Sequence, residues 1–188
     1  MKTQHQTSLQ TSLQASRRPG FTLVELLTVV AIILILAAIA VNGIGAFQKT
    51  QAKKTTEARI KFVETKLEEY KLDNGKYPLA ADFGTAATDG GASSSQTIGV
   101  ALSGRGSNGN IDTSREVYWA DLNPDNGKGI VSDDMQILDA YGYGLRYRTA
   151  DSPNAINPDF DLWSVGADGV TNLGNPDHSQ NEDDHTNY

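Results

Sequence analysis

The distribution of apolar and polar residues separates a membrane-like segment from a polar remainder. Residues 1–20 are polar and contain no run that would form a core. The following stretch, 21–41, is almost wholly apolar and carries one charged residue, Glu25. As a helix this stretch would be about 30 Å long, which matches the hydrocarbon core of a bilayer. We therefore predict a transmembrane helix over 21–47.

The apolar pattern changes after this segment to a single stripe on a charged helix. Residues 48–73 contain neither Pro nor Gly, and Asn74-Gly75 is a typical helix end. Four apolar residues recur at helical spacing and form the stripe: Ile60, Val63, Leu67 and Tyr70. The two patterns together predict one helix over 21–73, whose second half, within 48–75, packs on a soluble domain.

The rest of the chain combines loop-like composition with short strand patterns. Residues 80–116 are rich in Gly, Ala, Ser and Asp, so we expect little structure there, within a variable region 76–137. Three runs with aromatic or β-branched residues between turn residues predict strands: Glu116–Ala120, Gly144–Thr149 and Phe160–Val165. The expected fold class is α+β, a long helix followed by a small antiparallel sheet within 138–188.

Composition and charge exclude several classes of function. The chain has no cysteine, so neither a disulfide nor a thiolate site is possible. The formal net charge is −7 and no basic patch is evident, which argues against direct binding to nucleic acid. The histidines lie in polar tails, and there is no Ser–His–Asp pattern or phosphate-binding Gly-Lys-Ser loop. We therefore predict that the protein is not an enzyme.

The basic residues before the apolar run predict its orientation in a membrane. Lys2, Arg17 and Arg18 precede the run, so the N-terminus should stay cytoplasmic while the bulk of the chain crosses. A cleaved secretory signal is the alternative, because 37–40 offers a weak cleavage site of small residues. The length of the run and the continuing helical pattern favour a retained anchor.

The junction between leader and anchor carries a specific motif, Gly20-Phe21-Thr22-Leu23-Val24-Glu25. It resembles the type III signal of type IV pilins and of type II secretion pseudopilins. This resemblance implies that a prepilin peptidase removes residues 1–20 by cutting between Gly20 and Phe21, and methylates the new amine of Phe21. Gly20 suits that step, because a residue without a side chain lets a protease approach the backbone closely.

Glu25 is unusual because it places a charge inside the predicted membrane segment. A carboxylate there costs about 2.5–3.5 kcal/mol, so its presence calls for a reason. Cleavage would create a positive amine one helical turn earlier, and a helix N-terminus also favours an anion. The resemblance assigns Glu25 to pairing with the amine of a neighbouring subunit during assembly. The alternative is that Glu25 lies at the depth of the lipid headgroups.

The soluble part also resembles the major pseudopilins, over Leu138–Tyr147, Phe160–Gly169 and the acidic ending Asn181–Tyr188. For residues 80–137 we identify no counterpart in that family. In major pseudopilins the C-terminal loop binds Ca²⁺, a cation that takes six to eight oxygen ligands from carboxylates, carbonyls and water. The alternative is a solvated acidic tail. The resemblance implies carbonyl ligands from Val165 and Val170, a side-chain ligand in Asp168, and one or two more among Glu182, Asp183 and Asp184.

The resemblance implies a structural subunit of a type II secretion pseudopilus. Such a subunit is anchored in the bacterial inner membrane with its soluble domain in the periplasm. It is processed by prepilin peptidase and polymerises with itself on an assembly platform, together with minor pseudopilins. Two alternatives stay open. One is the major subunit of a surface type IV pilus for adhesion, motility or DNA uptake, and the other is an anchored periplasmic binding protein that does not polymerise.

Overall fold

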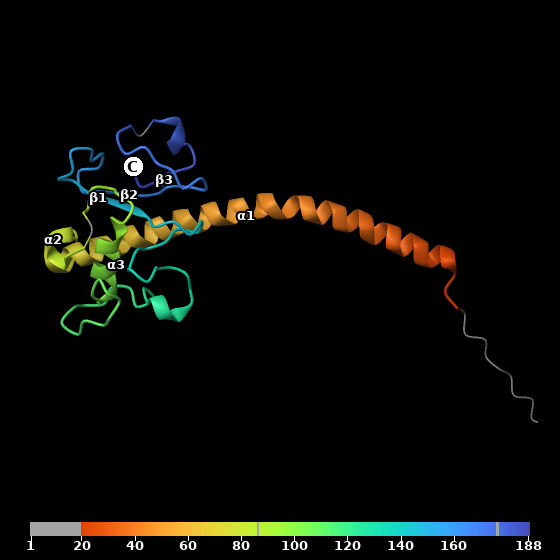
Figure 1. The fold of residues 1–188 in the computed structure, drawn as a ribbon, viewed down its shortest axis with the longest axis horizontal. Helices are drawn as coiled ribbons and strands as arrows, with labels where there is room; N and C mark the ends of the chain where they lie inside the picture. Colours follow the sequence, from red (N-terminus) through yellow and green to blue (C-terminus); the bar gives the residue numbers. More distant parts are fainter. Residues whose placement is uncertain (1–19, 86, 176) are drawn as a thin grey trace, which may run out of the picture. The chain divides into compact units, whose positions relative to one another are not determined.

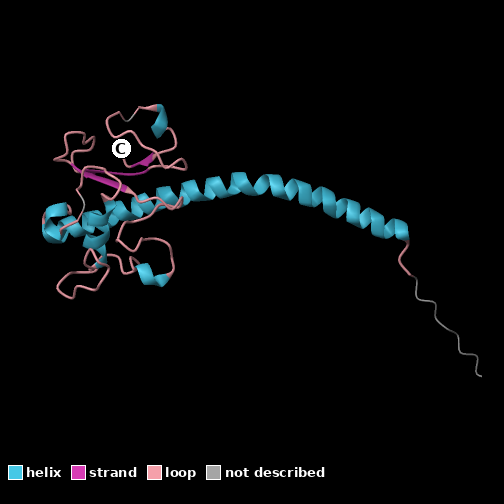
Figure 2. Ribbon diagram, in the orientation of Figure 1, coloured by secondary structure: helices cyan, strands magenta, loops and turns pink. Residues whose placement is uncertain are grey.

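A long helix and a small three-stranded sheet dominate the described part of the chain. The computed structural model describes residues 20–85, 87–175 and 177–188, without the side chains of 40–44 and 46. The predicted leader therefore lies, apart from Gly20, outside the described residues. In chain order the elements are α1 (Leu23–Asn74), α2 (Ala80–Phe83), α3 (Ser95–Ser103), η1 (Pro124–Asn126), β1 (Arg146–Thr149), β2 (Phe160–Ser164), η2 (Ser179–Asn181) and β3 (His185–Thr186) (Figures 1 and 2).

The expected α+β class is confirmed: one long N-terminal helix precedes a small antiparallel sheet. The predicted helix 21–73 corresponds to α1. The chain divides into two compact units, Met1–Gly45 and Ala46–Tyr188, so α1 contributes residues to both.

The first unit contains the N-terminal part of α1, and its described side chains are exposed throughout. The apolar side chains of Phe21, Leu23 and Ile39 are 89%, 78% and 67% exposed. Among the described residues, no helix combines the length and the apolar character needed to cross a membrane. The transmembrane segment 21–47 stays a prediction, and it includes side chains that lie outside the described part of the chain.

The second unit is built on the predicted apolar stripe of α1. Ile60, Val63 and Leu67 are at most 2% exposed and share one core cluster with side chains of β1 and β2. Burial of each such aliphatic side chain contributes about 1.5–3 kcal/mol, so this stripe fixes the helix on the sheet. The helix ends as predicted, because Gly75 has a φ of 73° and donates its N–H to the Lys71 carbonyl at 2.7 Å.

The sheet has the order β1-β2-β3 and is antiparallel throughout. Leu162 pairs with Tyr147, and both side chains belong to the core beneath the sheet. Because side chains alternate along a strand, the neighbouring pair, Arg146 and Trp163, lies on the opposite face. Trp163 also pairs with Thr186 of β3, so this second face carries residues from all three strands. The predictions for β1 and β2 are confirmed, whereas β3 was not anticipated.

The predicted strand Glu116–Ala120 is wrong. The N–H groups of Tyr118 and Trp119 both donate to the Leu102 carbonyl, at 2.9 and 2.8 Å, and so close the C-terminus of α3. The aromatic rings that suggested a strand pack edge-on against α1 instead, with Trp119 4.8 Å from Phe62 between ring centroids. The aromatic residues of this segment therefore serve to pack against a helix and do not form part of a β-sheet.

The prediction of a loop with little structure over 80–116 is also wrong, because α3 is a buried helix. Ile98 and Leu102 are fully buried in the core. Gly99 allows the close approach: a Cβ built on it would lie 1.8 Å from the Met135 carbonyl oxygen. The small residues that made the segment look loop-like are what let this helix fit against its neighbours.

Candidate functional site

The start of α1 is held by reciprocal hydrogen bonds between Thr22 and Glu25. The Thr22 hydroxyl accepts from the Glu25 N–H at 3.2 Å, and a Glu25 carboxylate oxygen accepts from the Thr22 N–H at 2.9 Å. The Thr22 hydroxyl also donates to that oxygen at 2.9 Å. This arrangement is a capping box, which satisfies two backbone donors left free at a helix N-terminus. Glu25 therefore has a role within its own chain.

The predicted processing junction lies immediately before this cap. Gly20 is exposed, with no atom within 4 Å of a Cβ built on it, and Phe21 is 89% exposed. A cut between these two residues would leave the hydrogen bonds of Thr22 and Glu25 in place. The capping box thus fits the helix of a processed chain as well as that of a precursor.

A second group of predicted site residues meets where the 165–171 loop contacts the acidic tail. One carboxylate oxygen of Asp183 accepts from the N–H groups of Ala167 and Asp168, at 2.7 and 3.1 Å. Gly166 makes this approach possible: its φ is 67°, and a Cβ there would lie 2.5 Å from Asp183. Asp183 therefore ties the tail to the loop.

Asp184 lies beside this contact and is incompletely satisfied. One of its carboxylate oxygens accepts from the Thr171 hydroxyl at 2.7 Å, and that hydroxyl accepts from the Trp163 indole N–H at 3.2 Å. The other oxygen, Oδ1, is buried and has no hydrogen-bond partner. A buried polar atom without a partner is rare in folded proteins and indicates a missing water or ion.

Burial raises the pKa of Asp184 to about 6, and the nearby carboxylates of Asp183 and Asp168 add to the rise. A raised folded pKa means that the folded state binds the proton more tightly than the unfolded chain, where an Asp titrates near about 3.9. The stability contributed by this group is therefore present at low pH and is lost as pH rises through about 6.

The other predicted ligands occupy varied positions. Asp168 is exposed, and one of its carboxylate oxygens accepts from the Val170 N–H at 2.8 Å. Val165 is fully buried, Val170 is 41% exposed, and Glu182 is exposed at the end of η2. Over the described ranges, no three His, Asp or Glu side chains form a ready-made metal-binding group. Any ion held here would need backbone carbonyl ligands as well.

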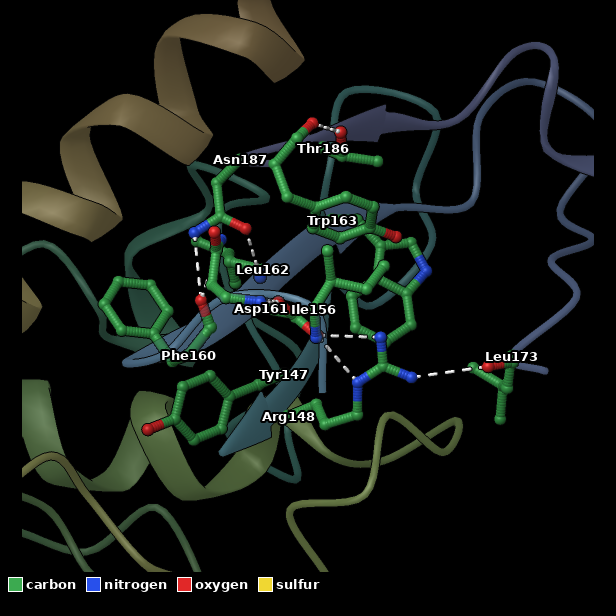
Figure 3. A network of polar contacts seen from close by, with 12 residues as sticks. Tyr147, Arg148, Ile156, Phe160, Asp161, Leu162, Trp163, Leu173, Thr186 and Asn187 are labelled. Atoms are coloured by element: carbon green, nitrogen blue, oxygen red, sulfur yellow. Dashed lines mark hydrogen bonds and ion pairs between the residues drawn. The ribbon is translucent and has the colours of Figure 1, made fainter. Parts of the chain in front are cut away.

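On the outer face of the sheet, Arg148 and Asp161 form a buried ion pair (Figure 3). Asp161 accepts from Arg148 Nε at 2.8 Å and Nη2 at 2.7 Å, and from the N–H groups of Ile156 and Asn157 at 2.9 and 2.8 Å. Arg148 also donates to the Leu173 carbonyl at 3.3 Å. This network holds the loops on either side of β2 against the sheet that carries the acidic junction.

A family model matches the N-terminal part of the chain. Residues 15–41 match the family model described as the prokaryotic N-terminal methylation motif, which includes Gly20, Phe21 and Glu25. The chain therefore carries a prepilin-type methylation motif at the predicted processing junction. The methylation motif predicted at the junction is thereby confirmed.

The chain is also similar to three curated proteins, each named type II secretion system core protein G. It is 40% identical to the one from Aeromonas hydrophila over 67 residues, which are 35% of this chain and 46% of the relative. The identity is 36% over 62 residues for Dickeya chrysanthemi, covering 33% and 40%, and 42% over 67 residues for Pseudomonas aeruginosa, covering 35% and 46%. The matches span less than half the length of each relative.

Two features of the candidate site were missed from the sequence. The first is the capping box, which the spacing Thr22-x-x-Glu25 before an apolar run would have predicted. The second is the part played by Thr171, which could not be predicted, because a single threonine in a polar loop carries no pattern. Its hydroxyl lies between Trp163 and Asp184 only because β2 and the tail are brought together by the fold.

Proposed function

We propose that this protein is a structural subunit of a type II secretion pseudopilus. The observation that carries the proposal is the methylation motif over 15–41 together with the N-terminal part of α1, whose described apolar side chains up to Ile39 are all exposed. The similarity to the core protein G relatives supports the choice of machine. An exposed apolar surface of this extent requires a partner in lipid or in other chains.

The exposed N-terminal part of α1 supplies the mechanism of assembly. In the precursor, the apolar side chains of this part are buried in the inner membrane while the second unit lies in the periplasm. After prepilin peptidase cuts at Gly20, an assembly platform extracts the subunit, and the helices of successive copies bury one another, with minor pseudopilins as further partners. Each aliphatic side chain transferred from water to such contacts contributes about 1.5–3 kcal/mol, so the helix supplies most of the cohesion.

Processing gives the first test. The protein isolated from its native membrane is expected to begin at N-methylated Phe21, as measured by intact mass and N-terminal sequencing. Gly20→Val, which adds a branched side chain at the cut, should leave the full-length precursor in the same membrane fraction. A native chain that begins at Met1, or that is cut near Ala40, would contradict the proposal and indicate an anchored or secreted domain.

A deletion strain separates the two kinds of filament. Without this subunit, exported proteins should accumulate in the periplasm, and a plasmid copy should restore their secretion. Normal secretion together with a loss of adhesion, motility or DNA uptake would instead identify the subunit of a surface type IV pilus.

We further propose that the loop–tail junction binds Ca²⁺. The residues suit a hard cation, because Asp184 Oδ1 is buried without a partner and the carboxylates of Asp168 and Asp183 are close enough to raise its pKa. Asp168 and Asp184 would supply side-chain oxygens, and the carbonyls of Val165 and Val170 the backbone ones. Asp183 already bonds to two backbone N–H groups, so its part is to hold the tail in place. The bound ion would link the tail to the sheet in a chain that has no cysteine.

Calcium is expected to raise the melting temperature of the full chain in detergent micelles. At a concentration one hundred times the Kd the gain would be about 2.7 kcal/mol, which corresponds to roughly 5–10 °C for a domain of this size. The gain should be larger at about pH 7.5 than at about pH 5, because protons compete with the ion for Asp184. Asp184→Asn should abolish most of it, while Asp125→Asn, in a separate exposed turn, is the control. Identical melting curves with calcium and with chelator would contradict the proposal of a calcium site.

A further inference from the structure

Two arginines on the outer face of β1 differ in how they are satisfied. Arg148 is 2% exposed, and its guanidinium donates hydrogen bonds to the Asp161 carboxylate and to the Leu173 carbonyl. Arg146, two residues earlier, is partly exposed, but its Nε and Nη1 atoms are buried without any hydrogen-bond partner. Buried guanidinium N–H groups normally have partners, so these two nitrogens need an explanation.

The acidic junction lies on the same face of the sheet as Arg146. Arg146 pairs with Trp163 across β1 and β2, and Trp163 pairs with Thr186 across β2 and β3. Thr186 follows Asp184 by two residues, and Trp163 reaches Asp184 through the Thr171 hydroxyl. The two unpartnered nitrogens of Arg146 and the unpartnered carboxylate oxygen of Asp184 therefore belong to one small, partly buried region.

The charges in this region act on one another. Burial lowers the pKa of Arg146, and the carboxylates of Asp139 and Asp184 oppose that effect. Asp139 is already committed, because it accepts from the N–H groups of Tyr141 and Tyr143 at 2.9 Å each and from the Ser164 hydroxyl at 2.6 Å. Asp184, with one oxygen free, is the acid that remains available to Arg146.

We infer that Arg146 is a built-in counter-ion of the loop–tail junction: it steadies the acidic cluster when no metal is bound and weakens calcium binding there. The inference rests on the calcium site proposed above. A fixed positive charge beside Asp184 offsets the repulsion among Asp168, Asp183 and Asp184, so the tail stays docked without an ion. The same charge repels an incoming divalent cation, so the site would respond to high calcium concentrations rather than to traces.

Arg146→Gln in the full chain, purified in detergent micelles, tests both effects. Removing one nearby charge should tighten calcium binding about tenfold by isothermal titration calorimetry, since an interaction of this kind is worth about one pKa unit. In chelator the same variant should melt at a lower temperature than the unsubstituted chain. Arg146→Lys keeps the charge and should behave as the unsubstituted chain in both measurements. Lys128→Gln makes the same change in net charge at Lys128, which is paired with Asp121 on the surface, and should alter neither.

The outcomes separate this inference from the calcium proposal. If the unsubstituted chain binds calcium and Arg146→Gln binds it with equal affinity, the counter-ion role is overturned while the calcium site stands. If the unsubstituted chain does not bind calcium, both are overturned. Should Arg146→Gln fail to fold, Arg146→Met retains the aliphatic stem and carries the same test. Equal loss of stability in the Gln and Lys variants would show that Arg146 matters for packing and not for charge.

Discussion

Replacing Asp161 by Ala is expected to lower the free energy of unfolding of the second unit by about 3–5 kcal/mol. The side chains of Arg148 and Asp161 are 2% and 0% exposed, so the substitution leaves a buried guanidinium without its counter-ion. It also leaves the N–H groups of Ile156 and Asn157 without their acceptor. Denaturant unfolding of the full chain in micelles, followed by circular dichroism, would measure the loss.

A surface ion pair in the same unit provides the control. Lys71 and Asp159 lie 3.2 Å apart, but their side chains are 38% and 56% exposed. Asp159→Ala should therefore cost less than about 1 kcal/mol. If Asp161→Ala also cost less than that, water would have to reach Arg148, and the network would not anchor the loops as described.

Glu25→Ala is expected to leave membrane insertion intact but to reduce the yield of filaments at least tenfold. Two causes contribute. The variant loses the capping box, worth about 1 kcal/mol, and it loses the charge that would pair with the amine of Phe21 in a neighbouring copy, worth up to about 2 kcal/mol. Filaments sheared from cells and quantified by immunoblot, with electron microscopy of the same samples, would report the yield.

Two matched variants separate capping from charge. Glu25→Gln keeps an acceptor that suits the capping box but removes the charge. Thr22→Ala removes the cap and keeps the charge of Glu25. If charge pairing governs assembly, Glu25→Gln should fail as Glu25→Ala does, while Thr22→Ala should still assemble. The reverse pattern would make Glu25 a helix cap alone, and normal filaments from all three variants would exclude both roles.

The elements that were predicted correctly are those whose pattern repeats locally. The stripe of Ile60, Val63 and Leu67 specifies one face of a helix whatever that face contacts, and Asn74-Gly75 ends the helix by backbone preference alone. The strands β1 and β2 likewise carry their own aromatic and β-branched residues between turn residues.

The elements that were missed depend on distant contacts. β3 is only His185–Thr186, and these two residues form a strand because β2 offers Trp163 and Ser164 as partners. The helix α3 is rich in small residues. One of them, Gly99, is needed because the Met135 carbonyl packs against it, and this contact cannot be predicted from the local sequence. At the site, the acidic residues could be selected from the sequence. That Arg146 Nε and Nη1 and Asp184 Oδ1 lack hydrogen-bond partners follows from packing that no local pattern encodes.

The Trp163–Thr171–Asp184 chain also gives the molecule an internal optical reporter. The protein has two tryptophans, and Trp119 lies next to Phe62, in contacts apart from the acidic junction. Trp163 is 1% exposed, and its indole N–H is linked to Asp184 by two successive hydrogen bonds. A change of charge at Asp184 alters the electrostatic environment of that indole. The contribution of Trp163 to the fluorescence emission of the unlabelled protein therefore reports on the acidic junction.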